Sequence, residues 1–534
     1  MSDKRSLWAW GYEDRRPDPE ALRDLVGGLL GVPVGPPTPA ASLDQFVMPE
    51  PRMEIPEKLR GICSTDRRDR AMHTYGKAFR DQVRAFRGDF SVAPDLVARP
   101  RTEDEVGAVL AGAEAEGAAV IPFGGGTSVV GGVEAPGGDR RAISLDLEAM
   151  DRVLEVDMES RAARIQAGAK GPSLERQLAE HGLTLRHYPQ SFEFSTLGGW
   201  IATRAGGHFA TLYTHIDELV ESLRVVTPRG VMATRRLPAS GAGPSPERLM
   251  LGSEGILGVI TEAWMRVQAR PRYRGSASVR FADFSGGVAA ARAVAQSHLY
   301  PSNCRLLDPL EARMNGVPAD GGAVLLLGFE SSDHSPEVKL RRAVELAEAC
   351  GGALTRPPTI RDDGPGAQGR GGDATAEAWR QAFFDGPYRQ GALIALGVLA
   401  DTFETCCTWR DFPALHGALG EAARRTFGRL GGRGVLSCRF THVYPDGPAP
   451  YYTFVVGGLT GVDLLDAWAE VKGAVSDALL AHGATITHHH AVGKFHRPWY
   501  DQERPGLFAA ALRGAKKALD PAGVLNPGVL IDGG

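Results

Sequence analysis

The sequence has few cysteines and no long hydrophobic run. Six cysteines occur in 534 residues, they form no Cys-x-x-Cys pair, and the adjacent Cys406 and Cys407 are poorly placed to bridge each other. This usage is typical of reduced thiols in a cytoplasmic protein, which is the location we expect. The longest apolar run, Ala392 to Ala400, is too short to span a bilayer. The N-terminal stretch MSDKRSLWAWGYEDRR has no apolar segment of the kind found in secretory signals.

An excess of charge of one sign is also missing. Lysine and arginine together number 60 against 64 acidic residues, a formal net charge of −4, so no global basic field exists to attract nucleic acid. The hydrophobic share of 43% and the charged share of 23% are ordinary for globular proteins and exclude a disordered or fibrous chain. A chain of 534 residues exceeds what one hydrophobic core can organise, so two or three packed units are expected.

Glycine is the residue in excess: it occupies 67 of 534 positions, about 12.5% of the chain. An average protein has roughly 7% glycine. Glycine permits tight turns and close approach of the backbone to a ligand. The excess therefore predicts many turns, or loops that lie against a bound molecule.

The pattern along the chain predicts an α+β fold in four segments. Residues 1–92 are a helical and extended segment, with a helix opening at Pro19. Residues 93–273 form a domain of short strands and helices that starts with a β–α–β unit. Residues 274–484 form a second α+β domain, which we expect to contain an antiparallel sheet with flanking helices. Residues 485–534 form a C-terminal segment.

Several elements can be placed by hydrophobic periodicity and by capping and turn residues. The expected helices are 106–117, preceded by Thr102 as a cap, then 174–181, 290–297 and 338–349. The expected strands are 119–123, 277–281 and 324–329, with a hairpin formed by 222–227 and 231–234. Residues 239–247 and the glycine-rich 361–376 are expected to be irregular loops, and the second to be mobile and to gate the pocket.

Three patches rich in glycine and hydroxyl side chains lie within about 140 residues. The first, PFGGGTS at 122–128, follows a strand and offers bare backbone amides to an anion. It is neither a Walker loop nor the dinucleotide fingerprint. The others are QSFEFSTLGG at 190–199, followed by TRAGG at 203–207, and GSEGILG at 252–258. One such patch alone is as well explained by a turn, but three together fit an extended cofactor that carries a diphosphate.

In order and spacing these patches resemble the FAD-binding domain of the vanillyl-alcohol oxidase and p-cresol methylhydroxylase superfamily. Within it the chain is most similar to the alkyldihydroxyacetonephosphate synthase-like flavoenzymes. The resemblance extends from Trp10 to Lys494 and includes WGYED, LRVVTPRG, GSEGILGVITEA, CRLLDP, DTFETCCTW, CRFTHVY, HHHAVGK and the later DPAGVLNPG. It implies that residues 93–273 are a two-subdomain FAD-binding domain, that 274–484 are a cap for the substrate, and that 485–534 return to the FAD site. It also implies a small-molecule substrate and a homodimer.

The resemblance also implies a set of cofactor-binding residues. Because Thr127 and Ser128 stand where related oxidases attach the flavin through histidine, we expect non-covalent FAD. The implied contacts are Pro122, Phe123, Gly124, Gly125, Gly126, Thr127, Ser128, Gln190, Ser191, Phe192, Glu193, Phe194, Ser195, Thr196, Thr203, Arg204, Ala205, Gly206, Glu254, Gly255, Ile256, Leu257, Gly258, Val259 and Ile260.

On the substrate side the resemblance implies catalytic roles for Tyr451, which matches the synthase acid/base tyrosine, and for the triplet His488, His489 and His490. On a strand, the first and third histidines would share one face, which is poor geometry for a three-histidine metal site. No bound metal is therefore expected. Without the resemblance, the tyrosine would be interpreted as core or interface and the histidines as polar packing.

The expected anion-binding residues are Arg305, Arg389, Gln390 and Arg439. An arginine in a strand can equally serve in an ion pair. In the synthases a Tyr-x-Arg-Asp segment supplies an arginine to the substrate phosphate, and here that arginine position is Gln390. Glutamine adds no charge and lacks the bidentate fork, so either Arg389 substitutes or the substrate carries no phosphate.

Two enzymatic functions follow, and a non-enzymatic flavin scaffold is a distant third. The first is an FAD-dependent oxidoreductase that takes hydride from a small polar or amphiphilic hydroxy substrate onto flavin N5. The alternative is a redox-neutral, synthase-like flavoenzyme that exchanges an acyl group for an alkyl ether. A metal-assisted 2-hydroxy-acid dehydrogenase is disfavoured, since only His442 and Asp446-Gly447 echo the metal motif of those enzymes.

Overall fold

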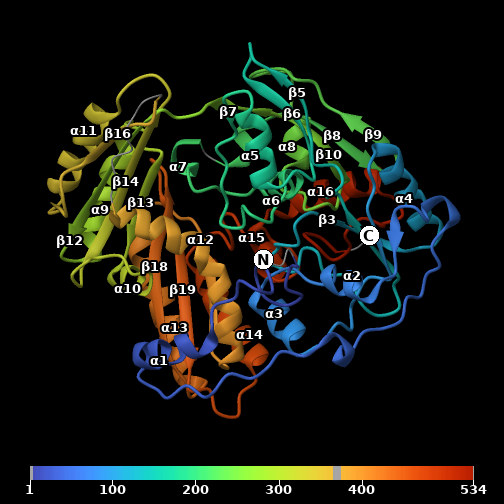
Figure 1. Ribbon diagram of the computed structural model, residues 1–534, viewed down its shortest axis with the longest axis horizontal. Helices are drawn as coiled ribbons and strands as arrows, with labels where there is room; N and C mark the ends of the chain where they lie inside the picture. Colours follow the sequence, from blue (N-terminus) through green and yellow to red (C-terminus); the bar gives the residue numbers. More distant parts are fainter. Residues whose placement is uncertain (1–3, 214, 365–373, 533–534) are drawn as a thin grey trace.

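The computed structural model describes residues 4–213, 215–364 and 374–532. The first ninety or so residues form short elements that run along one side of the molecule (Figure 1). Asp18 caps the first helix through the amide of Glu20, and Pro19 opens it, as the sequence predicts. The elements are α1 (Pro19–Leu30), η1 (Leu43–Gln45), η2 (Glu57–Leu59), β1 (Cys63–Ser64), α2 (Arg67–Met72) and α3 (Phe79–Phe86).

A small, largely parallel sheet follows in the order β1-β2-β4-β3. Strands β2 (Leu96–Ala98), β4 (Ala142–Asp146) and β3 (Ala119–Phe123) are parallel, and α4 (Glu103–Ala115) crosses between β2 and β3. Thr102 caps α4 through the amide of Glu105, with three acids in the first turn, which complements the helix dipole. The predicted strand 119–123 is confirmed, and it delivers the chain directly into the glycine loop.

The second sheet is antiparallel, in the order β5-β6-β10-β8-β9. The predicted hairpin is confirmed as β8 and β9, and the helix predicted at 174–181 forms as α5. The bounds are β5 (Val153–Asp157), β6 (Ala162–Gln166), α5 (Gly171–Ala179), β7 (Leu183–Thr184), α6 (Leu197–Thr203), α7 (Ala210–Tyr213), η3 (Ile216–Glu218), β8 (Val220–Thr227), β9 (Gly230–Ala233), α8 (Pro246–Met250), β10 (Val259–Arg266) and β11 (Gln268–Ala269).

The remaining strands form an eight-stranded antiparallel sheet in the described part of the chain. Its main path is β15-β12-β14-β13-β18-β19-β17, and β16 also pairs with β12. The strands are β12 (Tyr273–Phe281), β13 (Asn303–Leu307), β14 (Ala323–Ser331), β15 (Ala353–Leu354), β16 (Thr359–Asp362), β17 (Leu399–Glu404), β18 (Arg433–Val443) and β19 (Pro448–Gly457). The helices are α9 (Phe284–Gln296), α10 (Pro309–Met314), α11 (Glu337–Glu348), α12 (Ala374–Ala395), α13 (Phe412–Arg429), α14 (Leu464–Ala481), α15 (Arg497–Glu503) and α16 (Gly506–Leu519).

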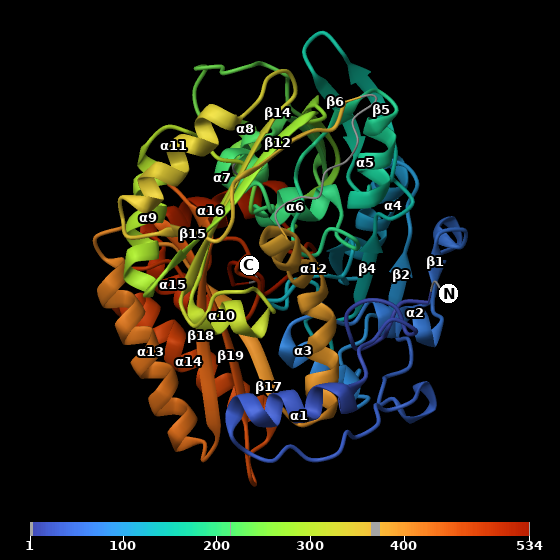
Figure 2. The same cartoon turned by 60° about the vertical axis from the view of Figure 1, so that its left-hand side comes forward.

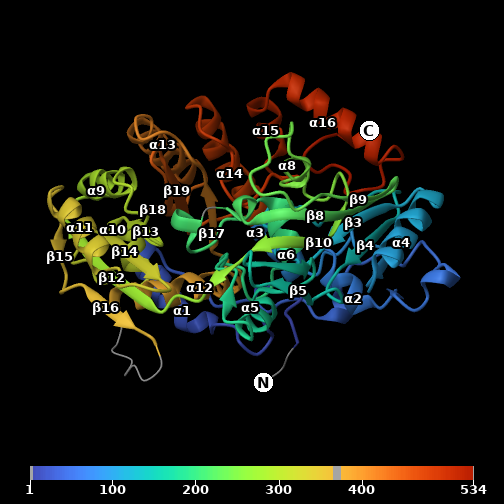
Figure 3. The ribbon, with the colours of Figure 1, turned by 90° about the horizontal axis from the view of Figure 1, so that it is seen from above.

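The two faces of this cap sheet have different partners. Helices α9, α11, α13 and α14 cover one face, while α12 and α1 lie on the other (Figures 2 and 3). Because strand side chains alternate, Tyr452 and Phe454 of β19 enter the core under the helices, whereas Tyr451 and Thr453 face a cavity. The same period of two puts Phe440 of β18 in the core. This sheet therefore supplies both the core of the cap and one wall of the site.

Two loop predictions need comment. Residues 239–247 are mostly irregular, but helix α8 starts at Pro246 with Ser245 as its cap. Within 361–376, strand β16 ends at Asp362 and helix α12 begins at Ala374, so the flanks are regular and that part of the prediction is wrong. Residues 365–373, where the mobile gate was expected, lie outside the described residues. The residue boundaries of the four segments stay a prediction.

Candidate functional site

A cavity of about 1000 Å³ lies between the glycine-rich patches and the exposed face of the cap sheet. Residues from nearly every predicted patch meet there. The predicted site residues that line it are Pro122 to Ser128, Gln190, Ser191, Ser195, Thr196, Thr203, Ala205, Gly206, Glu254, Gly255, Gly258, Val259, Ile260, Arg389, Gln390, Arg439, Tyr451, His489 and His490.

The glycine loop after β3 is tightly packed and leaves its amides free. A Cβ on Gly124 would overlap the Thr196 hydroxyl, one on Gly125 would overlap the carbonyl of Phe194, and Gly126 has a φ of +64°. Within the described chain the backbone amides of Gly125 to Ser128 donate to no protein acceptor. Free amides converging on a cavity form an anion-binding nest, so the loop can hold a diphosphate.

The second patch supports this loop. Thr196 caps α6 through the amide of Gly199, and Ser195 accepts a hydrogen bond of 2.7 Å from the indole of Trp200. Six predicted contact residues of the patches do not line the cavity: they pack behind it or point away. These are Phe192, Glu193, Phe194, Arg204, Ile256 and Leu257.

Glu254 connects the third patch to the end of the chain. Its carboxylate accepts the amides of Val492 (2.9 Å) and Gly493 (2.8 Å), and burial raises its pKa to about 7. Asn526 donates to the carbonyls of Glu254 (2.7 Å) and Gly132 (3.0 Å). These contacts bring the segment after residue 485 back to the glycine loops.

Tyr451 is buried at the cavity wall with its ring against the Arg439 guanidinium, 3.8 Å from carbon to ring centre. The phenol donates to the hydroxyl of Thr402 at 3.0 Å. Burial raises the pKa of Tyr451 above its ordinary value, and the effect of Arg439 in the other direction is smaller. The phenol is therefore protonated at neutral pH and can act as an acid.

The histidine triplet lies beside this tyrosine, but it is not on a strand, so the predicted alternation is wrong. The amides of His488 (2.7 Å), His489 (3.2 Å) and His490 (3.0 Å) all point at the carboxylate of Glu404. Three consecutive amides converging on one acceptor bend the chain and prevent a strand. His489 and His490 line the cavity, and their rings contact the ring of Tyr451.

Glu404 is a functional residue that our sequence reasoning missed, although it stands in the quoted stretch DTFETCCTW. It is 2% exposed and also accepts the hydroxyl of Thr487. Burial alone would raise its pKa, but His489 and His490, within 3.3 and 3.7 Å, together with these hydrogen bonds hold it well below its ordinary value. The signal available in the sequence was this acidic residue itself, in a stretch that carries the family resemblance.

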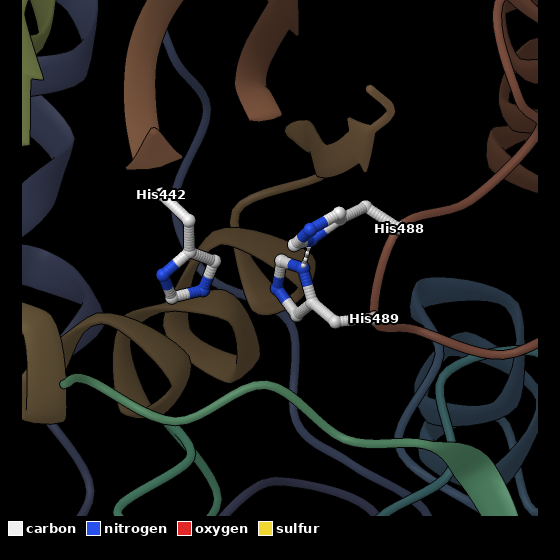
Figure 4. A group of neighbouring side chains, drawn as sticks. All are labelled: His442, His488 and His489. Atoms are coloured by element: carbon white, nitrogen blue, oxygen red, sulfur yellow. Dashed lines mark hydrogen bonds between the residues drawn. The ribbon is translucent and has the colours of Figure 1, made fainter. Parts of the chain in front are cut away.

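His442, His488 and His489 form a cluster whose ring nitrogens lie within 4.8 Å of one another, a spacing that could hold a metal ion. Figure 4 shows His442 projecting from the end of β18 toward the other two rings, which come from one loop. Yet both nitrogens of His488 already have protein partners: Nδ1 contacts His489 Nδ1 at 3.0 Å, and Nε2 contacts His215 Nε2 at 3.1 Å. Burial lowers the pKa of His442 and His488 well below the ordinary value, so these rings are neutral.

The absence of a bound metal therefore stays our prediction. Dialysis of the purified enzyme against a chelator is expected to leave its turnover unchanged, because the ring contacts of His488 need no metal. Metal analysis by plasma emission, before and after dialysis, checks this. Stoichiometric zinc whose removal abolishes turnover would contradict it.

The predicted anion-binding residues occupy different positions. Arg439 lines the cavity and pairs with Glu311 at 2.5 Å, and both side chains are buried. Arg305 does not line the cavity: it lies behind, bonded to His208 at 3.2 Å and covered by the rings of Trp379 and Phe383. Burial lowers the pKa of Arg305 to about 9.

Gln390 and Arg389 both line the cavity from helix α12. The Gln390 amide is held by protein partners: it donates to the carbonyl of Ala400 at 2.9 Å and accepts from Gln82. Among the described residues, Arg389 has one weak hydrogen bond, 3.4 Å from its Nη1 to the carbonyl of Met314. Of these two residues, Arg389 has more hydrogen-bond donors available for an anion.

The part of the cavity beside α1 is rich in apolar side chains. Helix α1 lines it with Leu22, Leu25, Val26 and Leu29, and Leu393 and Val455 lie there too. The sequence predicted this helix but gave no sign that it lines a pocket. Among the helices that the structure describes, none is long and apolar enough to cross a membrane.

Comparison with known proteins agrees with this geometry. Residues 94–234 match the family described as FAD binding domain, and residues 270–530 match the C-terminal domain of FAD linked oxidases. The alkyldihydroxyacetonephosphate synthase of Dictyostelium discoideum is 30% identical over 515 residues, which cover 92% of this chain and 84% of the relative.

Two solved structures are similar as well. One of alkyldihydroxyacetonephosphate synthase has a TM-score of 0.81 and 25% identity, covering 98% of this chain and 97% of its own. One of p-cresol methylhydroxylase has a TM-score of 0.66 at 14% identity, covering 88% of this chain and 94% of its own, and shows the fold alone. The α+β fold of the p-cresol methylhydroxylase type is thereby confirmed.

FAD fits the residues present. The free amides of the glycine loop suit its diphosphate, and the patches at 195–206 and 254–260 continue the same cavity toward Tyr451. FAD is the cofactor, and its non-covalent attachment stays a prediction. The chain is an FAD-dependent enzyme of oxidoreductase or synthase type, and it belongs to the family of FAD-linked enzymes that contains the alkyldihydroxyacetonephosphate synthases.

Proposed function

We propose that this enzyme carries out a redox-neutral, synthase-type reaction in which an acyl group of an amphiphilic dihydroxyacetone phosphate ester is exchanged for an alkyl ether. The observation that carries the proposal is the shape of the cavity, which joins a cofactor loop, an acid/base cluster and an apolar end. The synthase relatives, similar over nearly the whole chain, support this function over the hydride-transferring oxidoreductase that the sequence first suggested.

The apolar end suits an alkyl or acyl chain. Leu22, Val26 and Leu29 of α1 line the same cavity as Leu393, Val455 and Tyr451. Burying a methylene group is worth about 0.8 kcal/mol, so a long chain would contribute strongly to binding. A small 2-hydroxy acid would make no use of this apolar lining.

The acid/base residues suit the exchange. The bound flavin supplies an electron-poor ring that activates the substrate carbon, as cofactors do in such enzymes. His490 lines the cavity with its ring against that of Tyr451, and a nitrogen of this ring can accept the proton of the incoming alcohol. The Tyr451 phenol can donate to the oxygen of the departing carboxylate. The C–O bond to the acyl group breaks and a C–O bond to the alcohol forms.

Arg389 is our candidate for the substrate phosphate. Arg389→Gln is expected to raise KM for the phosphorylated substrate about 10- to 100-fold, since a hydrogen bond to a charged group is worth roughly 1.5–3 kcal/mol. Steady-state kinetics measure the effect, and Arg424→Gln, an exposed arginine of α13, is the matched control. An unchanged KM would place the anion at another arginine of the cavity.

The oxidoreductase remains the second candidate because Gln390 stands where the synthases have a phosphate-binding arginine. In that function the same tyrosine or His490 takes the hydroxyl proton while the substrate C–H gives hydride to the flavin. A homodimer and a cytoplasmic location also stay predictions.

The absorption spectrum of the flavin distinguishes the synthase from the oxidoreductase function. The purified yellow enzyme is mixed anaerobically with 2-hydroxy acids, with alcohols, and with acyl dihydroxyacetone phosphate plus a fatty alcohol, and products are identified by mass spectrometry. An ether product without lasting loss of flavin colour is the expected result. Stable bleaching by a hydroxy acid, with its keto acid as product, would overturn the synthase function in favour of the oxidoreductase.

A further inference from the structure

We propose that Lys77 is a cofactor-binding residue whose ammonium group neutralises the diphosphate of FAD in the glycine loop. Lys77 comes from the N-terminal segment, outside both matched domains at 94–234 and 270–530. The proposal does not depend on which reaction the enzyme performs, because both candidate functions use the same cofactor.

The backbone at this lysine is fixed against the loop. Its amide donates to the carbonyl of Ser128 at 2.6 Å, and its carbonyl accepts from the Gln82 side chain at 3.0 Å. A Cβ on the preceding Gly76 would overlap the carbonyl of Ser128, so only glycine permits this approach. The side chain therefore starts beside the free amides of the loop.

Lys77 is a buried residue whose amine reaches the cavity and has no bonded anionic partner in the described chain. Lys77 is 5% exposed, yet it lines the cavity with Gly124 to Ser128. In the described chain its Nζ has neither a hydrogen-bond acceptor nor an ion pair within bonding distance. A buried ammonium without a counter-charge is costly, which indicates that the complete site includes an anion.

The charged groups that face Lys77 are Arg5 and Asp81. Arg5, whose guanidinium donates to the carbonyl of Gly125 at 3.0 Å, disfavours a second positive charge, while Asp81 of α3 favours it. Burial, helped by Arg5, lowers the pKa of Lys77 to about 7, and burial raises that of Asp81 to about 7. The glycine loop offers no ionisable side chain.

A diphosphate with two negative charges beside this amine must raise its pKa. At the same pH a smaller fraction of Lys77 is charged in the free site than in the loaded site, because burial lowers its pKa and the diphosphate raises it again. Cofactor binding is therefore accompanied by uptake of a proton, in an amount that falls toward zero below pH 6, where the amine is already charged.

The test uses apoenzyme from the full chain. Titration with FAD, followed by quenching of flavin fluorescence, is expected to give a Kd about 10- to 100-fold higher for Lys77→Met, and within about threefold of wild type for Lys77→Arg. Riboflavin, which has no diphosphate, should bind both variants as it binds wild type. Lys58→Met, an exposed lysine of η2, is the control for losing a positive charge.

Calorimetry in buffers of different ionisation enthalpy measures the number of protons taken up when FAD binds. Wild type should take up a large fraction of one proton per FAD at pH 8, and Lys77→Met should take up less. Equal FAD affinity in Lys77→Met and wild type would overturn the proposal. If Lys77→Met does not fold, Lys77→Gln replaces it in the FAD titration, and an affinity equal to that of wild type would overturn the proposal.

Discussion

Replacing Tyr451 by phenylalanine is expected to leave the enzyme yellow but almost inactive. The hydroxyl of Tyr451 hydrogen-bonds only to Thr402 in the described chain, so its removal opens no large hole and leaves the cofactor loops untouched. A positioned general acid contributes a rate factor of about 10²–10⁴, so kcat should fall by that amount. The visible spectrum reports the retained flavin, and turnover with the proposed substrates reports the loss.

The next residue of the same strand supplies the control. Tyr452 is fully buried on the opposite face of β19, and its hydroxyl bonds to His416 at 3.1 Å. Tyr452→Phe removes the same atom in the core of the cap and should lower stability slightly while sparing turnover. If Tyr451→Phe and Tyr452→Phe have equal activity, the acid role of Tyr451 is wrong.

Replacing Glu404 by alanine is expected to cost both stability and activity. The carboxylate is the common acceptor of the amides of His488, His489 and His490, and it faces their rings. Each buried amide left without its acceptor costs about 1–3 kcal/mol, so the free energy of unfolding should fall by several kcal/mol. Because the histidine loop then lacks its anchor, kcat/KM should fall more than about 100-fold even where the protein stays folded.

The pH dependence of this variant has a definite sign. The pKa of Glu404 is lower in the folded than in the unfolded protein, so its stabilisation is present above about pH 4.3, the ordinary value for glutamate. It is lost as the pH falls through the folded pKa. Denaturant unfolding should therefore show the largest difference from wild type near neutrality and a smaller one in acid.

Glu503 is the matched control for Glu404. It accepts the Thr485 hydroxyl (2.7 Å) and the amide of Ile486 (2.8 Å), just before the histidine triplet, but it is exposed. Glu503→Ala should cost only about 0.5–1.5 kcal/mol, typical of an ordinary hydrogen bond. Equal losses of stability and activity in the two variants would show that Glu404 only fixes the position of the loop and does not affect the histidine rings.

The parts that the sequence predicted well are those fixed by local rules. Thr102 with the acids after it specifies the start of α4, and three bare glycines after β3 specify a loop that no other residue fits. Alternation along β19 puts Tyr451 and Tyr452 on opposite faces whatever the rest of the chain does.

The parts that were missed depend on contacts between distant segments. The triplet at 488–490 would continue as a strand if the amides had a strand partner, but Glu404, more than eighty residues earlier, takes all three. Arginine is a residue type that often binds anions, but in the fold Trp379 and Phe383 cover the guanidinium of Arg305. Lys77 carries no sequence motif, and only the folded position of Ser128 beside it reveals its role.

Helix α1 has a consequence for the order in which this chain folds. It is synthesised before α12, β18 and β19, on which it packs and whose residues come some 350 to 430 positions later. Contacts of such long sequence separation form slowly, because a large loop must close before they give any stability. Helix α1 therefore docks only after the cap sheet has formed. Until then its leucines are exposed and can associate with other chains.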